Sequence, residues 1–121
     1  MAKILVVDDE KDICKEFRDI LEEDNHQVDI VFRGDEAIER VREIPYDLVF
    51  LDMLMPWMEG ARVLREIKKI REVPVAVMSG FLPPMKEKEV REIGVIACFS
   101  KPLDLIVVKN LLKTVESQRN S

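Results

Sequence analysis

The sequence has no excess of positive charge and no long hydrophobic run. It contains 19 lysines and arginines against 24 aspartates and glutamates, which gives a formal net charge of −5. Nucleic-acid binding draws much of its affinity from cations that meet phosphates, so direct nucleic-acid binding is not expected. Only four strongly apolar residues, 4–7, follow the first three residues, too few for a signal-peptide core or a membrane span. We therefore expect a cytoplasmic protein without a membrane segment.

Cysteine and histidine are scarce, since the sequence contains two cysteines and one histidine. Cys14 and Cys98 lie far apart in the chain, and we expect both to be small buried thiols in a reducing compartment. His26 lies where a helix is expected to give way to a strand, and we expect it at the surface. Zinc sites are built mainly from clustered Cys and His residues, so zinc is not expected.

Glycine and proline are also few, with four and six residues among 121. The hydrophobic fraction of 47% and the charged fraction of 36% are typical of a globular protein with well-formed helices. The length suits one domain with a full core and leaves no room for a second. We expect a single domain over residues 1–121, with a polar tail from about residue 117.

Short apolar runs alternate with stretches of helical periodicity along the chain. The runs typical of buried strands are residues 3–7, 28–32, 48–51, 75–78 and 95–99. The stretches with apolar residues at helical spacing are residues 13–21, 37–41, 63–70, 85–93 and 106–115. This strict alternation predicts a parallel sheet with right-handed crossovers and helices on both faces. The expected fold class is therefore α/β, with a doubly wound five-stranded parallel sheet flanked by five helices.

The last two expected helices differ from the others in their apolar residues. In the fourth, Met85, Val90 and Ile93 are the few apolar anchors, so we expect a short and loosely held helix. In the fifth, Ile106 and Val107 are left over once the core positions are filled, and they could face a partner.

The main functional candidate is Asp52, which ends the third apolar run and precedes a loop. Open α/β sheets bind ligands at the carboxyl ends of their strands. Three acidic residues, 8–10, follow the first run, Ser79 ends the fourth and Lys101 follows the fifth. Each has an ordinary explanation as a helix cap, a turn residue or a solvated lysine. Their joint occurrence at the ends of four strands favours a shared site.

The chemistry of these side chains suits phosphoryl transfer. Clustered carboxylates repel one another unless a cation is present, and hard oxygen ligands suit Mg²⁺, with Mn²⁺ as an alternative. Asp52 would be the nucleophile that forms an aspartyl phosphate. Lys101 would pair with the phosphoryl oxygens, and Ser79 would donate a hydrogen bond to another of them.

This arrangement resembles the receiver domain of two-component response regulators, the CheY-like family, along nearly the whole chain. The residues that carry the resemblance are the Asp8–Asp9 pair, Asp52 with Met55, Pro56 and Gly60 after it, Ser79, and the Lys101–Pro102 pair. The resemblance implies a flavodoxin-like sheet with strand order 2-1-3-4-5. It also implies a metal site made by Asp8, Asp9, Asp52 and the backbone carbonyl of Leu54, and a cis peptide bond between Lys101 and Pro102.

The resemblance implies a reaction and its partners as well. Asp52 would take a phosphoryl group from a phosphohistidine on a sensor histidine kinase or a histidine phosphotransfer protein, and would later lose it to water. Such a chain catalyses its own phosphorylation and dephosphorylation, but it is a signalling switch rather than a turnover enzyme. A downstream protein partner would read the phosphorylated state, and we expect a monomer or a weak dimer.

The switch residues depart from the family at one position. Ser79 matches the residue that moves toward the phosphoryl group, but Cys98 stands where the family usually has a Tyr or Phe that changes rotamer. Phe99 is one place later, and we expect it to face the opposite side of the strand. This pattern is similar to that of some single-domain receivers that act as phosphorelay intermediates.

Leu54 and Phe81 lie two residues beyond Asp52 and Ser79, at positions that flank the phosphorylation pocket in the family. Because both are apolar, our hypothesis is that they hinder the hydrolytic water and make the aspartyl phosphate long-lived.

Three alternatives remain open from the sequence. The chain could be a receiver-like module that binds partners without phosphorylation, although such modules usually lack one of the residues present here. It could be a receiver excised from a DNA-binding response regulator, whereas we favour a stand-alone receiver that signals through protein contact. A flavin- or nucleotide-binding protein of the same fold would need a phosphate cradle where this chain has the acidic residues 8–10.

Overall fold

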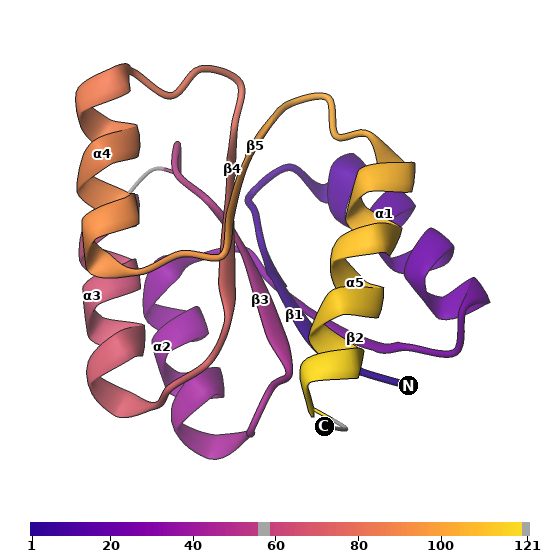
Figure 1. Cartoon of the computed structure of the whole chain (residues 1–121). Coiled ribbons are helices and arrows are strands. Elements are labelled where there is room, and N and C mark those ends of the chain that lie inside the picture. The colour runs from indigo at the N-terminus through magenta and orange to yellow at the C-terminus, as the bar shows by residue number, and fades with distance from the viewer. Residues whose placement is uncertain (56–58, 120–121) are drawn as a thin grey trace.

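The computed structural model describes residues 1–55 and 59–119, so Pro56 of the motif and the last two residues of the polar tail lie outside the described residues. Five strands form one parallel sheet in the order β2-β1-β3-β4-β5 (Figure 1). The strands are β1 (Lys3–Val7), β2 (Gln27–Val31), β3 (Leu48–Asp52), β4 (Val75–Ser79) and β5 (Ala97–Ser100). The predicted fold class and strand order are confirmed.

Helices cover both faces of this sheet. They are α1 (Lys11–Glu23), α2 (Gly34–Glu43), α3 (Gly60–Ile70), α4 (Pro84–Ile93) and α5 (Leu105–Arg119). Figure 1 shows α1 and α5 on one side of the sheet and α2, α3 and α4 on the other. Among the described residues, no helix has the length and apolar character needed to cross a membrane.

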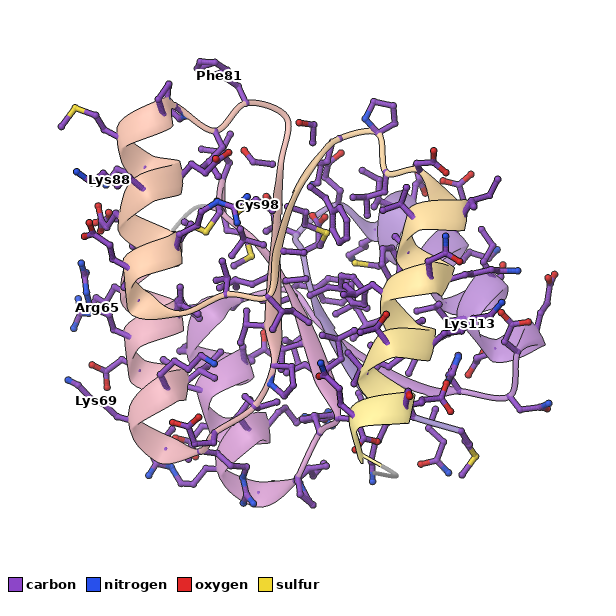
Figure 2. All side chains as sticks on the ribbon, in the orientation of Figure 1. Arg65, Lys69, Phe81, Lys88, Cys98 and Lys113 are labelled. Atoms are coloured by element: carbon purple, nitrogen blue, oxygen red, sulfur yellow. The ribbon has the colours of Figure 1, made fainter. Side chains whose placement is uncertain are left out.

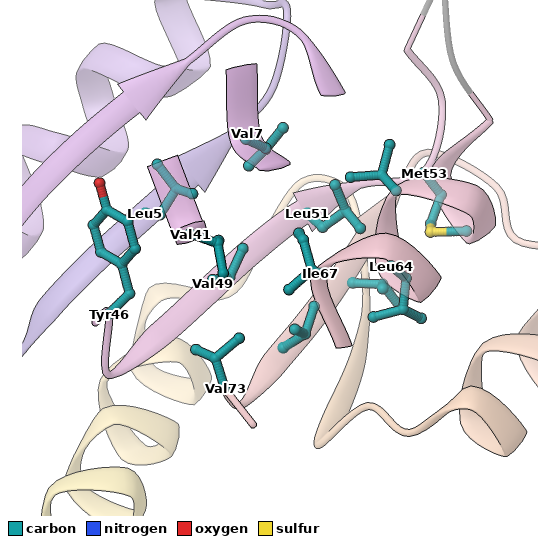
Figure 3. Packing of buried hydrophobic residues seen from close by; sticks show 14 of the residues in the cluster. Leu5, Val7, Val41, Tyr46, Val49, Leu51, Met53, Leu64, Ile67 and Val73 are labelled. Atoms are coloured by element: carbon teal, nitrogen blue, oxygen red, sulfur yellow. The ribbon is translucent and has the colours of Figure 1, made fainter. Parts of the chain in front are cut away.

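Alternation along the strands divides the core into two layers. Leu5 and Leu51 point into the layer covered by α2 and α3, where Ile67 packs against the sheet (Figure 3). Their neighbours Ile4 and Phe50 point into the layer covered by α1 and α5. Successive side chains of a strand face opposite sides, so a strand buried on both faces is apolar at every position. This explains the continuous apolar runs that end at the functional edge.

Three boundaries differ from the sequence prediction. Strand β2 ends at Val31, so Phe32 lies beyond it and is partly exposed. Strand β5 is Ala97–Ser100 rather than 95–99, although the Ile96 N–H already donates to the Val75 carbonyl of β4 at 2.9 Å. Helix α5 continues through Arg119, beyond the apolar spacing that ends at residue 115, and no glycine or proline interrupts it.

His26 is buried, so its predicted surface position is wrong. Its Nδ1 accepts a hydrogen bond from the Ala2 N–H at 3.0 Å. Its Nε2 lies 3.8 Å from a carboxylate oxygen of Glu116 on α5. The imidazole is therefore enclosed between the start of β1 and the end of α5, two segments at opposite ends of the chain.

Helix α4 is held by one fully buried residue, Val90, by the partly buried Ile93, and by ion pairs with its neighbours. Lys86 lies 2.6 Å from Glu59, and Glu89 lies 2.9 Å from Arg65 of α3. Met85 is 85% exposed, so the expectation that it anchors α4 is wrong. The helix begins at the second proline of the preceding loop, because a proline is tolerated at the first helical position.

Candidate functional site

Four side chains from separate parts of the chain meet at the carboxyl edge of the sheet. Asp8 follows β1, Glu10 precedes α1, Asp52 ends β3 and Lys101 follows β5. The carboxyl ends of parallel strands lie at one edge, which brings residues from both ends of the chain together. Asp8, Asp52 and Lys101 were predicted from the sequence to converge here, and Glu10 joins them.

The ammonium of Lys101 lies at the centre of this cluster. Its Nζ donates to Oδ2 of Asp8 at 2.7 Å, to Oε1 of Glu10 at 3.1 Å and to Oδ2 of Asp52 at 3.2 Å. The Lys101 side chain is 13% exposed. Burial opposes its charge, but the hydrogen bond with Asp8 and the charge of Asp52 outweigh burial, so the pKa of Lys101 lies above its ordinary value. The lysine therefore stays charged at physiological pH.

Asp52 is buried and held at both oxygens. Oδ1 accepts the backbone N–H of Leu54 at 3.0 Å, and Oδ2 accepts from Lys101. Burial is the largest cause that raises the pKa of Asp52 to about 6, against the lowering effect of the Leu54 N–H. The charge of Asp8 raises it further and that of Lys101 lowers it. The carboxylate is therefore ionised at neutral pH but loses its charge more readily than an exposed aspartate.

Three carboxylates of the cluster are close enough to share one cation. One oxygen from each of Asp8, Glu10 and Asp52 lies within 4.8 Å of the other two. All three are hard oxygen donors, which suits Mg²⁺ rather than zinc. Asp9 is exposed on the same turn and is not part of this cluster. The donor set therefore fits a divalent cation, with Glu10 rather than Asp9 nearest to the other carboxylates.

Ser79 lies at the same edge but makes its hydrogen bonds elsewhere. Its buried Oγ donates to the carbonyl of Phe81 at 2.8 Å and accepts the Phe81 N–H at 3.2 Å. Within the described residues no hydrogen bond joins Ser79 to Asp52. The Ser79 carbonyl accepts the N–H of Lys101 at 2.8 Å, and the Lys101–Pro102 bond is cis, as the resemblance implies.

Cys98 and Phe99 face opposite layers, as predicted from strand alternation. Cys98 packs against the layer under α3 and α4, where Figure 2 shows it beside the sheet. Phe99 packs in the other layer and stacks on Phe50, with ring centroids 6.5 Å apart. Neither cysteine forms a disulfide, and burial raises the pKa of Cys14 to about 11. The position of the usual aromatic switch therefore holds a small, partly buried thiol.

Leu54 and Phe81 form an exposed apolar rim on the loops that follow Asp52 and Ser79. Leu54 is 64% exposed and Phe81 is 67% exposed, and Figure 2 shows Phe81 on the loop between β4 and α4. Both line a cavity of about 180 Å³, together with Met53, Leu82, Pro83 and the ion-paired Glu59 and Lys86. Gly60, the first residue of α3, lies against Met53, and a Cβ there would lie only 2.9 Å from the Met53 Cα.

Two features of the edge were not assigned from the sequence. Glu10 was seen only as one of three adjacent acidic residues, since nothing in the sequence shows which way its side chain turns. A cavity of about 250 Å³ lies between α1 and the segment after β5. Its lining includes Ile13, Ile20 and Lys101, and the two isoleucines, expected in the core, are only half-buried.

Comparison with known proteins agrees with this geometry. The family model of the response regulator receiver domain matches residues 4–114. The transcriptional regulatory protein CpxR homolog of Haemophilus influenzae is 31% identical over 100% of this chain and 55% of its own length. Sporulation initiation phosphotransferase F of Bacillus subtilis is 30% identical over 92% of this chain and 90% of its own length. A two-component response regulator from Clostridium difficile superposes with a TM-score of 0.95 at 26% identity, and 100% of both chains is covered.

The doubly wound sheet with an acidic cluster and a lysine at its carboxyl edge is that of a CheY-like receiver. The chain belongs to the response regulator receiver domain family of two-component systems. Receiver domains of this family generally bind Mg²⁺, and they partner with histidine kinases or phosphotransfer proteins. The chain spans 32% to 55% of the length of the first four curated relatives that it matches.

Proposed function

We propose that this receiver is a phosphoacceptor in which Asp52 takes a phosphoryl group from a phosphohistidine. The donor is a sensor histidine kinase or a histidine phosphotransfer protein. The observation that carries the proposal is the position of Asp52, buried at the end of β3 with Lys101 at 3.2 Å. A carboxylate in this position can attack phosphorus in line, forming an O–P bond as the N–P bond of the phosphohistidine breaks.

The groups around Asp52 have different roles in this transfer. One carboxylate oxygen of Asp52 accepts the Leu54 N–H, and the other accepts a hydrogen bond from Lys101. With a pKa of about 6, the carboxylate is ionised and nucleophilic at neutral pH. The charge of Lys101 neutralises part of the negative charge of the incoming phosphoryl oxygens.

The metal in this proposal is Mg²⁺, with Mn²⁺ as an alternative. Asp8, Asp9, Asp52 and the Leu54 carbonyl would hold it, and the carboxylates of Asp8 and Asp52, each with an oxygen within 4.8 Å of the other, supply the hard oxygen donors that such an ion prefers. The bound ion would add positive charge next to the phosphoryl oxygens. Without that charge, the carboxylates of the cluster would repel the phosphoryl group.

Signal output in the proposal begins at Ser79. Its hydroxyl is engaged within its own loop with Phe81, so a new hydrogen bond to the phosphoryl group would release and reshape that loop. Cys98 lacks the bulk of the usual aromatic switch, so the loop after β4 and helix α4 would carry the change to a downstream protein partner. The similarity to a transcriptional regulatory protein of Haemophilus influenzae supports, as an alternative output, a receiver within a longer regulator.

The cavity between α1 and the segment after β5 supports a docking position for the phosphodonor. It is lined by Ile13, Phe17, Ile20 and Leu103, and it reaches Lys101 at the acceptor site. A donor protein seated on this apolar surface would place a histidine over the carboxyl edge. The apolar rim of Leu54 and Phe81 would limit the approach of water to the same edge, which supports a long-lived aspartyl phosphate.

The test is intact-mass analysis of the chain after incubation with acetyl phosphate, with and without Mg²⁺. The proposal predicts a single phosphoryl adduct that requires Mg²⁺ and is lost in Lys101→Met. An absence of adduct with acetyl phosphate and with phosphorylated histidine kinases would favour a receiver that binds its partners without phosphorylation.

A further inference from the structure

All three N–H donors of the Lys101 ammonium are in use. An ammonium has three donors, and Lys101 donates to Asp8, Glu10 and Asp52. In the proposed function the same ammonium must donate to a phosphoryl oxygen. At least one of the three carboxylates must therefore release Lys101 before or during the transfer.

The three carboxylates differ in what their release would cost. Asp8 is fully buried and Asp52 is nearly so, whereas the side chain of Glu10 is 55% exposed. A buried carboxylate that loses its cation stays desolvated, but an exposed one regains water. The bond to Asp8 is the shortest, at 2.7 Å, against 3.1 Å for Glu10 and 3.2 Å for Asp52, so exposure rather than length separates Glu10 from Asp52. Glu10 is therefore the partner that Lys101 releases most easily.

The backbone of Glu10 keeps its side chain near the lysine. The Glu10 N–H donates to Oδ1 of Asp8 at 2.9 Å, and the Glu10 carbonyl accepts the N–H of Cys14 in the first turn of α1. The Glu10 side chain makes no capping hydrogen bond to α1, so its carboxylate is available to Lys101. The side chain can therefore turn outward while the backbone stays in place.

We propose that Glu10 is a positioning residue that holds Lys101 in the resting state and gives up this contact to the arriving phosphoryl group. This inference rests on the proposed function, in which Lys101 binds the phosphoryl oxygens. Glu10 thereby slows the phosphorylation of Asp52, because its contact must be broken and because its charge repels the anionic donor. In this account Glu10 does not ligate the metal.

The test compares the rates of adduct formation in variants of Glu10, with acetyl phosphate and Mg²⁺ and with intact mass as the readout. Glu10→Gln and Glu10→Ala are expected to react about twofold to fivefold faster than the native chain, the range for loss of one partly exposed charge contact. Asp12→Asn is the matched control, because it removes the same charge two residues along, from an exposed side chain in the first turn of α1. It should react at the native rate.

Glu10→Asp separates the contact from the charge. This variant keeps the carboxylate but shortens the side chain by one methylene, so it should react faster than the native chain if the contact to Lys101 matters. A native rate in Glu10→Asp together with a faster Glu10→Gln would overturn the positioning role and leave only a charge effect. The ¹⁵N signal of the Lys101 ammonium should shift in Glu10→Ala and stay in place in Asp12→Asn, whatever the reactivity.

The remaining outcomes separate this inference from the proposed function. If the native chain forms no adduct, the proposed function fails. If it forms one and the Glu10 variants react at the rate of Asp12→Asn, only the role of Glu10 fails. A fall of tenfold or more in Mg²⁺ affinity in Glu10→Gln, measured by calorimetry, would instead make Glu10 a metal ligand and overturn the proposal.

Discussion

The ammonium of Lys101 lies 2.7 Å from a carboxylate oxygen of Asp8, although the two residues are 93 positions apart in the chain. The sheet order explains this distance, since β1 and β5 both end at the same edge and β3 ends between them with Asp52. One cation is thereby shared by three carboxylates, two of them buried. The balance of charge at this edge governs both the stability of the domain and its reactivity.

The ionised form of Asp52 should destabilise the metal-free fold. Its folded pKa is raised from 3.8 to about 6. Because the folded pKa of Asp52 lies above its unfolded pKa, protonation of Asp52 favours the folded state. This contribution to stability is complete below the unfolded pKa and is lost as the pH rises through about 6. In EDTA we therefore expect Asp52→Asn to raise the free energy of unfolding by about 1–2 kcal/mol at pH 7.5, after allowance for solvent screening, and by little at pH 4.

Urea denaturation of both proteins at the two pH values measures this difference. Asp12→Asn, which removes an exposed aspartate, serves as the control and should leave stability within about 0.5 kcal/mol at either pH. If Asp52→Asn is no more stable than the native chain at pH 7.5, the ionised and buried carboxylate of Asp52 does not destabilise the fold.

The apolar rim should lengthen the life of the aspartyl phosphate. Replacing Leu54 and Phe81 together, as Leu54→Asn with Phe81→Glu, puts polar groups beside Asp52 that can hold and orient water. We expect dephosphorylation to become about tenfold faster, which corresponds to a barrier lower by about 1.4 kcal/mol. The measurement is the loss of the phosphoryl adduct with time after the donor is removed.

Met85→Glu provides the control for the rim, because Met85 is exposed on helix α4 but does not line the cavity formed by Leu54 and Phe81. Its adduct should decay at the native rate. An unchanged decay rate in the Leu54 and Phe81 double variant would contradict the hypothesis that these two side chains hinder the hydrolytic water.

Helix α4 should depend chiefly on its fully buried side chain, Val90. Val90 is fully buried in the layer under α3 and α4, so Val90→Ala is expected to lower the free energy of unfolding by about 1–2 kcal/mol. Met85→Ala removes a larger side chain from the same helix, but that side chain is 85% exposed, so a change within about 0.5 kcal/mol is expected. Chemical denaturation compares the two, and equal losses would refute the conclusion that Val90 contributes more to the packing of α4 than Met85 does.

The sequence predicted the parts of the fold that depend on local pattern. The apolar run before Asp52 identifies a strand buried on both faces, and the strand order that places it at the centre of the sheet was implied by the resemblance to the receiver family. Asp8 and Lys101 directly follow strands, so their convergence on Asp52 could also be foreseen. These predictions succeed because the direction of a parallel strand decides which of its ends faces the site.

The remaining details depend on packing between distant segments. His26 is buried because Ala2 and Glu116, near the two ends of the chain, close over it. The choice between Asp9 and Glu10 as the neighbour of Lys101 depends on how the turn after β1 rotates, and both residues are acidic. Such rotations leave no periodic signal in the sequence.

Locating the phosphoryl group on the chain tests the central claim most directly. After incubation with acetyl phosphate and Mg²⁺, the chain is reduced with borohydride, digested and sequenced by mass spectrometry, with Asp52→Asn treated in parallel. The account predicts one modified residue, Asp52, in the native chain and no modification in Asp52→Asn. Modification at Asp8, Asp9 or Glu10 instead, or an equal adduct in the variant, would contradict it.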